Sequence, residues 1–213
     1  MAWIDSRMVA FERCLKITTL PQEAEMRLPV PLDENGDTWV THGRITFENY
    51  TTRYRPETEI VLKELNIDIR PAEKIGVVGR TGAGKSTLCL AICRFLEANF
   101  GTIKIDGVDI SKVGLADLRD NITVIPQDAA IFENTLRFNL DPDEKVSDLE
   151  IMKLLTRASM TNLVLRDIKG LDSEIKGTDL SSGERQLICI CRAILRVSFS
   201  IIPIFIFRKR RLS

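Results

Sequence analysis

The sequence lacks the features that mark several common classes of protein. Its five cysteines form no Cys-x-x-Cys pair, so neither a disulfide framework nor a zinc site is indicated, and a reducing compartment is the simpler interpretation. The 30 basic and 30 acidic side chains cancel, so no global field would attract nucleic acid or acidic lipid. No apolar run reaches the roughly 20 residues that cross a bilayer, and the first residues lack the apolar segment of a secretory signal. We therefore expect a soluble or peripheral chain.

The length of 213 residues suits one domain with an extension, because single cores grow to roughly 250 residues. Apolar residues between Ile4 and Leu15 fall on one helical stripe, and the proline-containing segment 20–40 is typical of a linker. No internal repeat or low-complexity tract is present. The main domain is therefore expected after about residue 43.

The main domain alternates between strand and helix patterns. Strands are predicted in "RITFENY", "LNIDI" and "TIKIDGVDI", the last interrupted by an Asp106-Gly107 turn, and also in the apolar "KIGVVG". Helices are predicted for "STLCLAICRFL", for Asp148 to Ile168 and for "SSGERQLICICRAILR". This order favours an α/β core with an antiparallel β lobe and a helical insertion.

The strongest chemical signal is "GRTGAGKST", which matches the pattern G-x-x-x-x-G-K-[ST] between a predicted strand and a predicted helix. Glycines let the backbone wrap a phosphate, and successive N–H groups at a helix start bind the anion. Lys85 would contact the β and γ phosphates, and the Ser86 hydroxyl would coordinate Mg²⁺. A chance glycine-rich turn is the alternative. The candidate nucleotide-binding residues are Gly79, Arg80, Thr81, Gly82, Ala83, Gly84, Lys85, Ser86 and Thr87.

Two motifs downstream make this phosphate loop resemble one family. The order "VIPQDAAIF" then "LSSGERQ" is similar to the nucleotide-binding domain of an ABC transporter. The phrases "RYRPETEIVLKELNIDI", "GTIKIDGVDISKVGLADLR" and "NLDP" resemble most the second such domain of the multidrug-resistance-associated, or C, subfamily. The resemblance runs from about Gly43 to Arg196. It implies ATP and Mg²⁺ as cofactors, and it implies transport coupled to ATP binding and hydrolysis.

The resemblance also assigns roles to individual residues. Tyr54 corresponds to the aromatic residue that stacks on adenine, although a core tyrosine on a strand is the alternative. Gln127 corresponds to the glutamine that approaches Mg²⁺ and the attacking water. A signature segment would cap the γ phosphate held by a partner domain, and it comprises Leu180, Ser181, Ser182, Gly183 and Glu184.

The signature departs from the family pattern at two positions. Ser182 stands where glycine is common, and Glu184 stands where glutamine is usual. An additional carboxylate would repel a triphosphate, so we expect Glu184 to weaken the capping of ATP. The only histidine, His42, precedes the strands and cannot be the family's switch histidine, so we expect a surface residue. The paired cysteines at 89/93 and 189/191 are expected to be small core residues.

The last stretch, "VSFSIIPIFIFRKRRLS", also departs from the family. The resemblance places an aspartate near Ile204 and a glutamate near Phe205, so neither the Mg²⁺ contact nor the general base has its carboxylate. The stretch is too short for a membrane span, and Pro203 is poorly suited to a central strand. We expect a chain truncated after the signature, ending in an unrelated tail that fills the strand position only partly.

The expected fold is α/β, a P-loop NTPase core with an antiparallel β lobe and a helical subdomain, its C-terminal part missing. Residues 1–42 would be an N-terminal helix and linker from a transmembrane domain, 43–196 an incomplete ABC ATP-binding domain, and 197–213 the tail. The partners would be a transmembrane domain and a second nucleotide-binding domain at the cytoplasmic face of a membrane. Two alternatives are a non-catalytic module that docks on a full-length transporter and a membrane-surface role for the tail.

Overall fold

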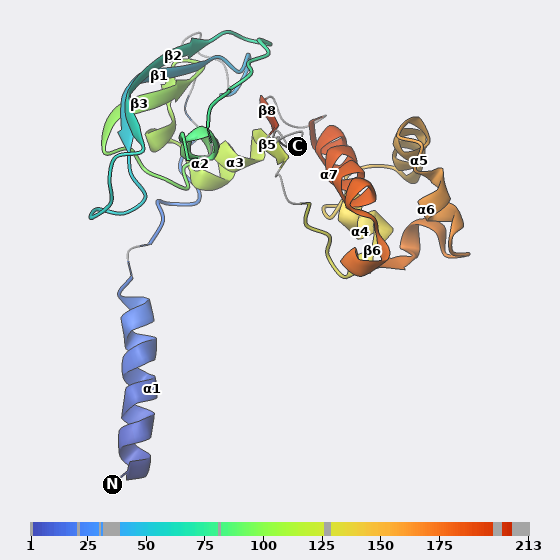
Figure 1. Ribbon diagram of the computed structural model, residues 1–213, viewed down its shortest axis with the longest axis horizontal. Coiled ribbons are helices and arrows are strands. Elements are labelled where there is room, and N and C mark those ends of the chain that lie inside the picture. Colours follow the sequence, from blue (N-terminus) through green and yellow to red (C-terminus); the bar gives the residue numbers. More distant parts are fainter. Residues whose placement is uncertain are drawn as a thin grey trace.

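Two groups of elements lie on either side of a short parallel strand pair in the computed structural model (Figure 1). The structure describes residues 2–20, 22–29, 31, 39–80, 82–125, 129–197 and 202–205. A β-rich part contains the predicted phosphate loop, and a helical part contains the predicted signature. Helix α1, Ala2–Thr18, projects away from both.

The β-rich part is an antiparallel sheet with strand order β2-β1-β3-β4, covered on one face by helices. Strand β1 pairs with both β2 and β3, and Ile45 lies opposite Ile69 and Ile105. The strands predicted in "RITFENY", "LNIDI" and "TIKIDGVDI" are confirmed, as is the Asp106-Gly107 turn. The elements of this part are β1 Ile45–Thr52, β2 Leu62–Ile69, α2 Lys85–Ile92, β3 Phe100–Ile105, β4 Val108–Asp109, η1 Ile110–Lys112 and α3 Leu115–Asp120.

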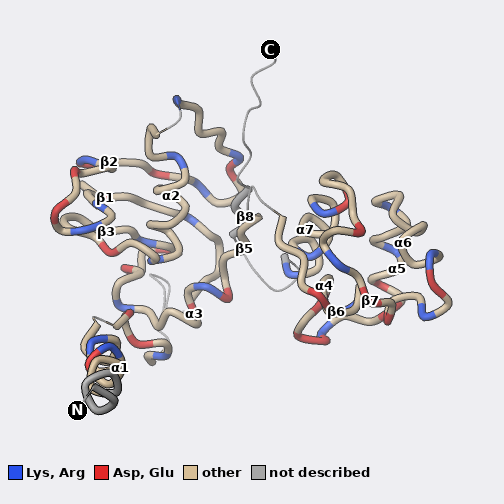
Figure 2. The backbone as a smooth tube through the Cα atoms, turned by 60° about the horizontal axis from the view of Figure 1, so that its bottom comes forward, with Lys and Arg blue, Asp and Glu red and all other residues tan. Residues whose placement is uncertain are grey.

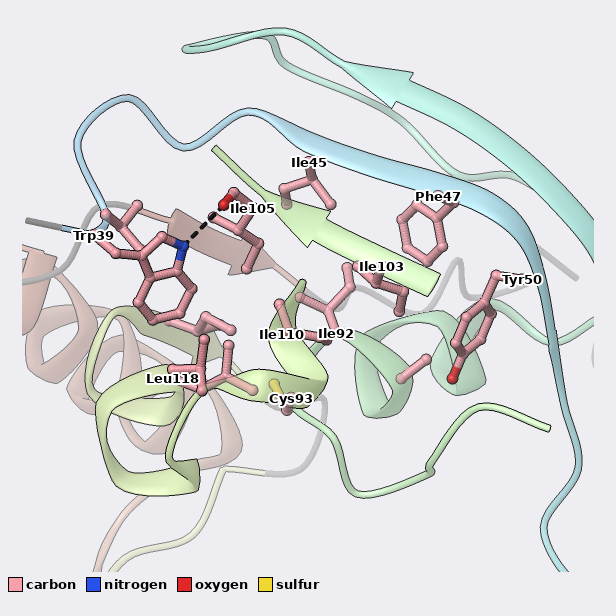
Figure 3. Close-up of a cluster of buried hydrophobic side chains, with 14 of the residues drawn as sticks. Trp39, Ile45, Phe47, Tyr50, Ile92, Cys93, Ile103, Ile105, Ile110 and Leu118 are labelled. Carbon is pink, nitrogen blue, oxygen red and sulfur yellow. Dashed lines mark hydrogen bonds between the residues drawn. The ribbon is translucent and has the colours of Figure 1, made fainter. Parts of the chain in front are cut away.

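The core of this part lies between the sheet and helices α2 and α3 (Figure 3). Phe47 and Tyr50 from β1 pack edge-to-face, with ring centroids 5.8 Å apart. Trp39, at the end of the predicted linker, is buried, and its indole N–H donates to the carbonyl oxygen of Ile105 at 2.8 Å. The segment before the sheet is thus anchored in the core at its final residues.

Asp106 organises the turn between β3 and β4. Its carboxylate accepts hydrogen bonds from the backbone N–H groups of Thr41, His42, Gly43 and Arg44, at 2.8 to 3.0 Å. Burial alone would raise the pKa of this carboxyl, but the four donors outweigh burial and hold the pKa below its usual value of 3.8. One buried side chain therefore fixes the entry of the chain into the sheet.

Helix α2 ends four residues earlier than predicted, so Phe95 and Leu96 do not continue its apolar face. Arg94 adopts the left-handed conformation with φ 52°, its N–H donates to Ala91, and the N–H of Phe95 donates to Leu90. This is the Schellman termination, here without the usual glycine. The buried Arg94 guanidinium secures it by donating to the carbonyls of Ile110 and Val113, at 2.8 and 3.0 Å.

The predicted strand "KIGVVG" is not formed. Residues 74–79 have no strand assignment, and Ile75, Val77 and Val78 are 48%, 51% and 94% exposed. A strand requires a neighbour to complete its hydrogen bonds, whatever its apolar content. In the described part of the chain, β5 (Ile122–Ile125) and β8 (Ile202–Phe205) pair only with each other, and neither pairs with this segment.

The helical part has its own core, formed mainly by α4, α5, α6 and α7. Ser147 and Glu150 form a capping box at the start of α5. The predicted helix 148–168 is split, because Ser159 adopts φ 57° and ends α5. The elements of this part are β6 Asn134–Thr135, α4 Leu136–Leu140, α5 Asp148–Arg157, α6 Thr161–Leu165, η2 Gly170–Asp172, β7 Glu174–Ile175, η3 Gly177–Asp179 and α7 Ser182–Val197.

The apolar tail contributes a strand. Strand β8, Ile202–Phe205, runs parallel to β5, Ile122–Ile125, and Pro203 lies opposite Thr123. A proline is tolerated in such a short pair because its ring nitrogen can face away from the partner strand. Part of the tail therefore belongs to the fold, while residues 206–213 lie outside the described residues.

Helix α1 confirms the predicted N-terminal helix. Its described apolar side chains, among them Phe11 and Ile17 at 60% and 67% exposure, do not pack on the rest of the chain. Among the described residues, no helix combines the length and apolar character needed to cross a bilayer.

The Asp106 anchor predicts an acid-sensitive contribution to stability. The pKa of Asp106 is lowered in the folded state, so the carboxylate stabilises the fold fully above pH 3.8, its usual pKa. This stabilisation is lost as the pH falls through the lower pKa of the folded state. Asp106→Asn should lower the free energy of unfolding at pH 7 by about 1–3 kcal/mol, measured by urea denaturation. The control is Asp109→Asn, a half-buried residue whose carboxylate accepts from the N–H of Ser111, two residues away. Equal losses in both variants would contradict this role.

Candidate functional site

The predicted phosphate loop surrounds the start of α2. Gly82 and Gly84 have φ of 84° and 80°, in the left-handed region that glycine adopts without strain. A Cβ at Gly84 would also lie 3.0 Å from a side-chain carbon of Leu62, on β2. Glycine at this position therefore serves both the turn into the helix and the close approach of β2.

Lys85 extends its side chain back over this loop. The ammonium donates to the carbonyl oxygens of Gly79 and Arg80, at 2.8 and 2.7 Å. These neutral acceptors occupy two of its three N–H groups, and charge-assisted bonds to an anion would be stronger. The arrangement therefore holds a cation beside the helix N-terminus, which itself favours negative charge.

The next two residues of α2 have different surroundings. Ser86 is exposed, so its hydroxyl is accessible to a ligand or a cation. Thr87 is 3% exposed, and its hydroxyl is 2.9 Å from the hydroxyl of Tyr54. This hydrogen bond ties Tyr54 to the phosphate-loop helix while its side chain stays 49% exposed, so the alternative of a core tyrosine is not what the structure has.

Two of the predicted site residues, Thr81 and Gln127, lie outside the described residues. Among those that are described, no group of three or more His, Cys, Asp or Glu side chains is arranged to hold a metal ion.

The predicted signature forms the start of α7. Ser181 Oγ accepts from the N–H of Glu184 at 3.2 Å, and the Glu184 carboxylate accepts from the N–H of Ser181 at 2.8 Å. This reciprocal pair is a capping box. Leu180 is buried in the helical core, Ser182 is the first residue of the helix, and a Cβ on Gly183 would meet nothing within 4 Å.

The surroundings of Glu184 bear on the repulsion expected from its charge. The pKa of Glu184 lies below its usual value. The largest cause is the hydrogen bond from the backbone of Ser181, followed by the bond to the Ser181 side chain, and the ion pair with Arg166 at 2.6 Å adds to them. The carboxylate therefore stays ionised, but it is directed into its own helix start and toward a cation. Sequence reasoning missed Arg166, because an exposed arginine 18 residues away gives no local signal.

The phosphate loop and the signature are not brought together within one chain. Figures 1 and 2 both place α2 and α7 on opposite sides of β5 and β8. In this strand pair, Ile204 lies opposite Val124 and Phe205 opposite Ile125. The positions at which the resemblance expects two carboxylates are thus the last two residues of β8.

The cysteines and the histidine behave as expected from their positions. All five thiols are free, and His42 is exposed. Burial raises the pKa of four of the thiols, that of Cys93 to about 11, so they are protonated at neutral pH. They are packing residues rather than reactive thiolates.

The comparisons with known proteins agree with this arrangement. The family model described as ABC transporter matches residues 62–201. The chain belongs to the ABC transporter family. Its α/β fold, with an antiparallel β lobe and a helical subdomain, is confirmed as that of an ABC nucleotide-binding domain, and such domains generally bind ATP with Mg²⁺.

Much longer proteins, one of them a member of ATP-binding cassette sub-family C, are relatives of this ABC domain. It is 46% identical over 200 residues to the ATP-binding cassette sub-family C member 2 of Homo sapiens, covering 92% of this chain and 13% of that protein. It is 42% identical over 201 residues to the Metal resistance protein YCF1 of Saccharomyces cerevisiae, covering 91% of this chain and 13% of that protein. The resemblance to the C subfamily is confirmed, and the chain spans about an eighth of these relatives.

A solved structure is similar over nearly the whole ABC domain. It is that of a bacterial Atm1-family ABC exporter with ATP bound, with a TM-score of 0.78 and 26% sequence identity. The match covers 95% of this chain and 35% of the exporter chain. The similarity therefore includes both the β-rich and the helical part.

The capping box predicts a measurable effect of the signature serine on stability. Ser181→Ala removes the acceptor for the N–H of Glu184 and should lower the free energy of unfolding by about 1 kcal/mol. Chemical denaturation monitored by circular dichroism measures this loss. Ser182→Ala, one residue later and inside the helix, is the matched control and should change stability by less. A larger loss for Ser182→Ala would place the cap elsewhere.

Proposed function

We propose that this chain is the ATP-binding domain of an ABC exporter. The observation that carries the proposal is the Lys85 ammonium, held beside the N-terminus of α2 by two neutral carbonyl acceptors. The β and γ phosphates of ATP would replace these acceptors with stronger, charge-assisted bonds. Residues 79–87 would bind the phosphates, and Ser86 and Gln127 would contact the Mg²⁺ that accompanies them.

The exposed side chain of Tyr54 would supply the adenine contact. Stacking on a base needs an accessible flat face, and Tyr54 is exposed while its hydroxyl is fixed to Thr87. Because Thr87 belongs to the phosphate-loop helix, the base contact and the phosphate contacts would have a fixed separation. This supports ATP, rather than a bare phosphate group, as the ligand.

The signature would act on a second nucleotide-binding domain. The separation of α2 from α7 supports a site completed between two domains, in which residues 180–184 cap the γ phosphate held by the partner. Residues 1–42 would be the connection to a transmembrane domain, 43–196 the ATP-binding domain and 197–213 the tail. The chain would then work at the cytoplasmic face of a membrane, through those partners.

Hydrolysis by the chain should be poor. The reaction needs a carboxylate for Mg²⁺ and another to polarise the attacking water, and the corresponding residues of β8 are Ile204 and Phe205. The same observation favours a second candidate function. The chain would be a non-catalytic module that binds ATP and docks on a full-length transporter through the signature.

The binding proposal is tested by removing the ammonium. Lys85→Ala should weaken Mg-ATP binding by about 1.5–3 kcal/mol, or roughly 10- to 150-fold in Kd, measured by isothermal titration calorimetry. Lys63→Ala, on the exposed side of β2, removes the same charge elsewhere and should leave the Kd unchanged. An unchanged Kd in Lys85→Ala, with the fold intact by circular dichroism, would refute the proposed site.

The hydrolysis proposal is tested by phosphate release at saturating Mg-ATP. General-base help is worth roughly 10² to 10⁴ in rate, so the wild-type chain should release phosphate near the rate of the Lys85→Ala variant. Turnover well above background that Lys85→Ala abolishes would show that another residue supplies the base. Both candidates imply dimerisation with a complete nucleotide-binding domain, detected by analytical ultracentrifugation. Dimerisation combined with background phosphate release from the Lys85 site would favour the docking module.

A further inference from the structure

The segment between α1 and the β-rich part is docked on α3. Residues 23–28, here called the strap, run past the start of this helix. The N–H groups of Leu115 and Ala116 donate to the carbonyls of Glu25 and Met26, at 3.1 and 2.8 Å. The first N–H groups of a helix have no partner within the helix, so the strap satisfies two of them.

Gly114 lets the strap approach this closely. A Cβ on Gly114 would lie 2.7 Å from the backbone nitrogen of Leu28 and 2.8 Å from the Cα of Arg27. Both distances are shorter than real Cβ contacts, and both involve backbone that cannot move aside without undocking. Close packing of the strap on α3 therefore requires glycine at position 114.

Arg119, one turn further along α3, binds the first residue of the strap. Its guanidinium donates to both carboxylate oxygens of Glu23, at 3.0 and 2.9 Å. Such a two-point pair fixes the orientation of both side chains more tightly than a single bond would. The guanidinium carbon also lies 4.4 Å from the ring centroid of Phe95, so the cation stacks on the aromatic ring.

The same guanidinium binds the end of the phosphate-loop helix. It donates to the carbonyl of Cys93, the C-terminal cap of α2, at 3.2 Å, and to the carbonyl of Arg94 at 3.3 Å. Carbonyls at a helix C-terminus have no partner in the helix and favour a cation. One side chain thus joins the strap to α2, whose first residue is Lys85.

We propose that Arg119 is a positioning residue that couples docking of the strap to nucleotide binding. The coupling rests on the proposed function of the phosphate loop. Helix α2 has only two turns between Lys85 and Cys93, so a shift at its C-terminus is transmitted to the phosphate loop without bending. By linkage, bound nucleotide must tighten the strap by the factor by which the docked strap tightens nucleotide.

Hydrogen exchange of the Leu115 and Ala116 amides reports directly on strap docking. In the wild-type chain, saturating Mg-ATP should slow exchange of both amides by about fivefold or more, the lower end of ordinary coupling between sites. Glu23→Gln leaves Arg119 in place but removes the charge that holds it. This variant should weaken Mg-ATP binding by a similar factor and abolish the nucleotide-dependent change in exchange.

Two further variants separate coupling from simple stability. Arg119→Lys keeps the charge but cannot bind both oxygens of Glu23 and both carbonyls of α2, so it should give an intermediate effect. Glu48→Gln is the matched control, because it breaks an exposed ion pair with Lys104 on the sheet and should leave affinity and exchange unchanged.

The outcomes distinguish the two proposals. Saturable Mg-ATP binding with unchanged exchange of Leu115 and Ala116 would overturn the coupling and leave the nucleotide site standing. Faster exchange in Glu23→Gln with an unchanged Kd would do the same, because Arg119 would then only fasten the strap. Absence of any saturable binding in the wild-type chain would overturn both proposals together.

Discussion

Helix α2 is held at both of its ends, and the arrangement of the β-rich part depends on this. At the N-terminus, Lys85 folds back onto the carbonyls of Gly79 and Arg80, and the Tyr54–Thr87 hydroxyl pair ties the first turn to the segment that follows β1. At the C-terminus, Arg94 donates to the carbonyls of Ile110 and Val113, and Arg119 donates to the carbonyl of Cys93, the C-terminal cap of α2. A short helix is marginal in isolation, so these contacts, with burial of Ala91 and Ile92, keep α2 in place.

The phosphate loop and the antiparallel sheet could be predicted from the sequence because their signals are local. Alternation of apolar residues and the Asp106-Gly107 turn specify β1 to β4, and glycines at fixed spacing specify the loop. The end of α2 could not be predicted, because Arg94 occupies a position where glycine is usual and is held there by carbonyls 16 and 19 residues away. Docking of the strap likewise joins Glu23 to Arg119, 96 residues apart.

The failure at "KIGVVG" has a different cause. Composition reports how well a segment suits a buried strand, but strand formation also requires a partner in register. In the described residues, β8 takes the edge of β5, while 74–79 has no strand partner. The orientation of the Glu184 carboxylate was also not predicted from the sequence. It is set by the ion pair with Arg166, 18 residues away, and by the capping box with Ser181.

The chain is proposed to bind ATP and to keep it intact. The most direct measurement is the identity of the nucleotide that the protein retains after incubation with Mg²⁺ and ATP labelled at the α phosphate. After rapid removal of free nucleotide, we expect the label that stays with the protein to be ATP rather than ADP. Retained ADP would contradict this expectation, because it would show that the chain has a working catalytic base.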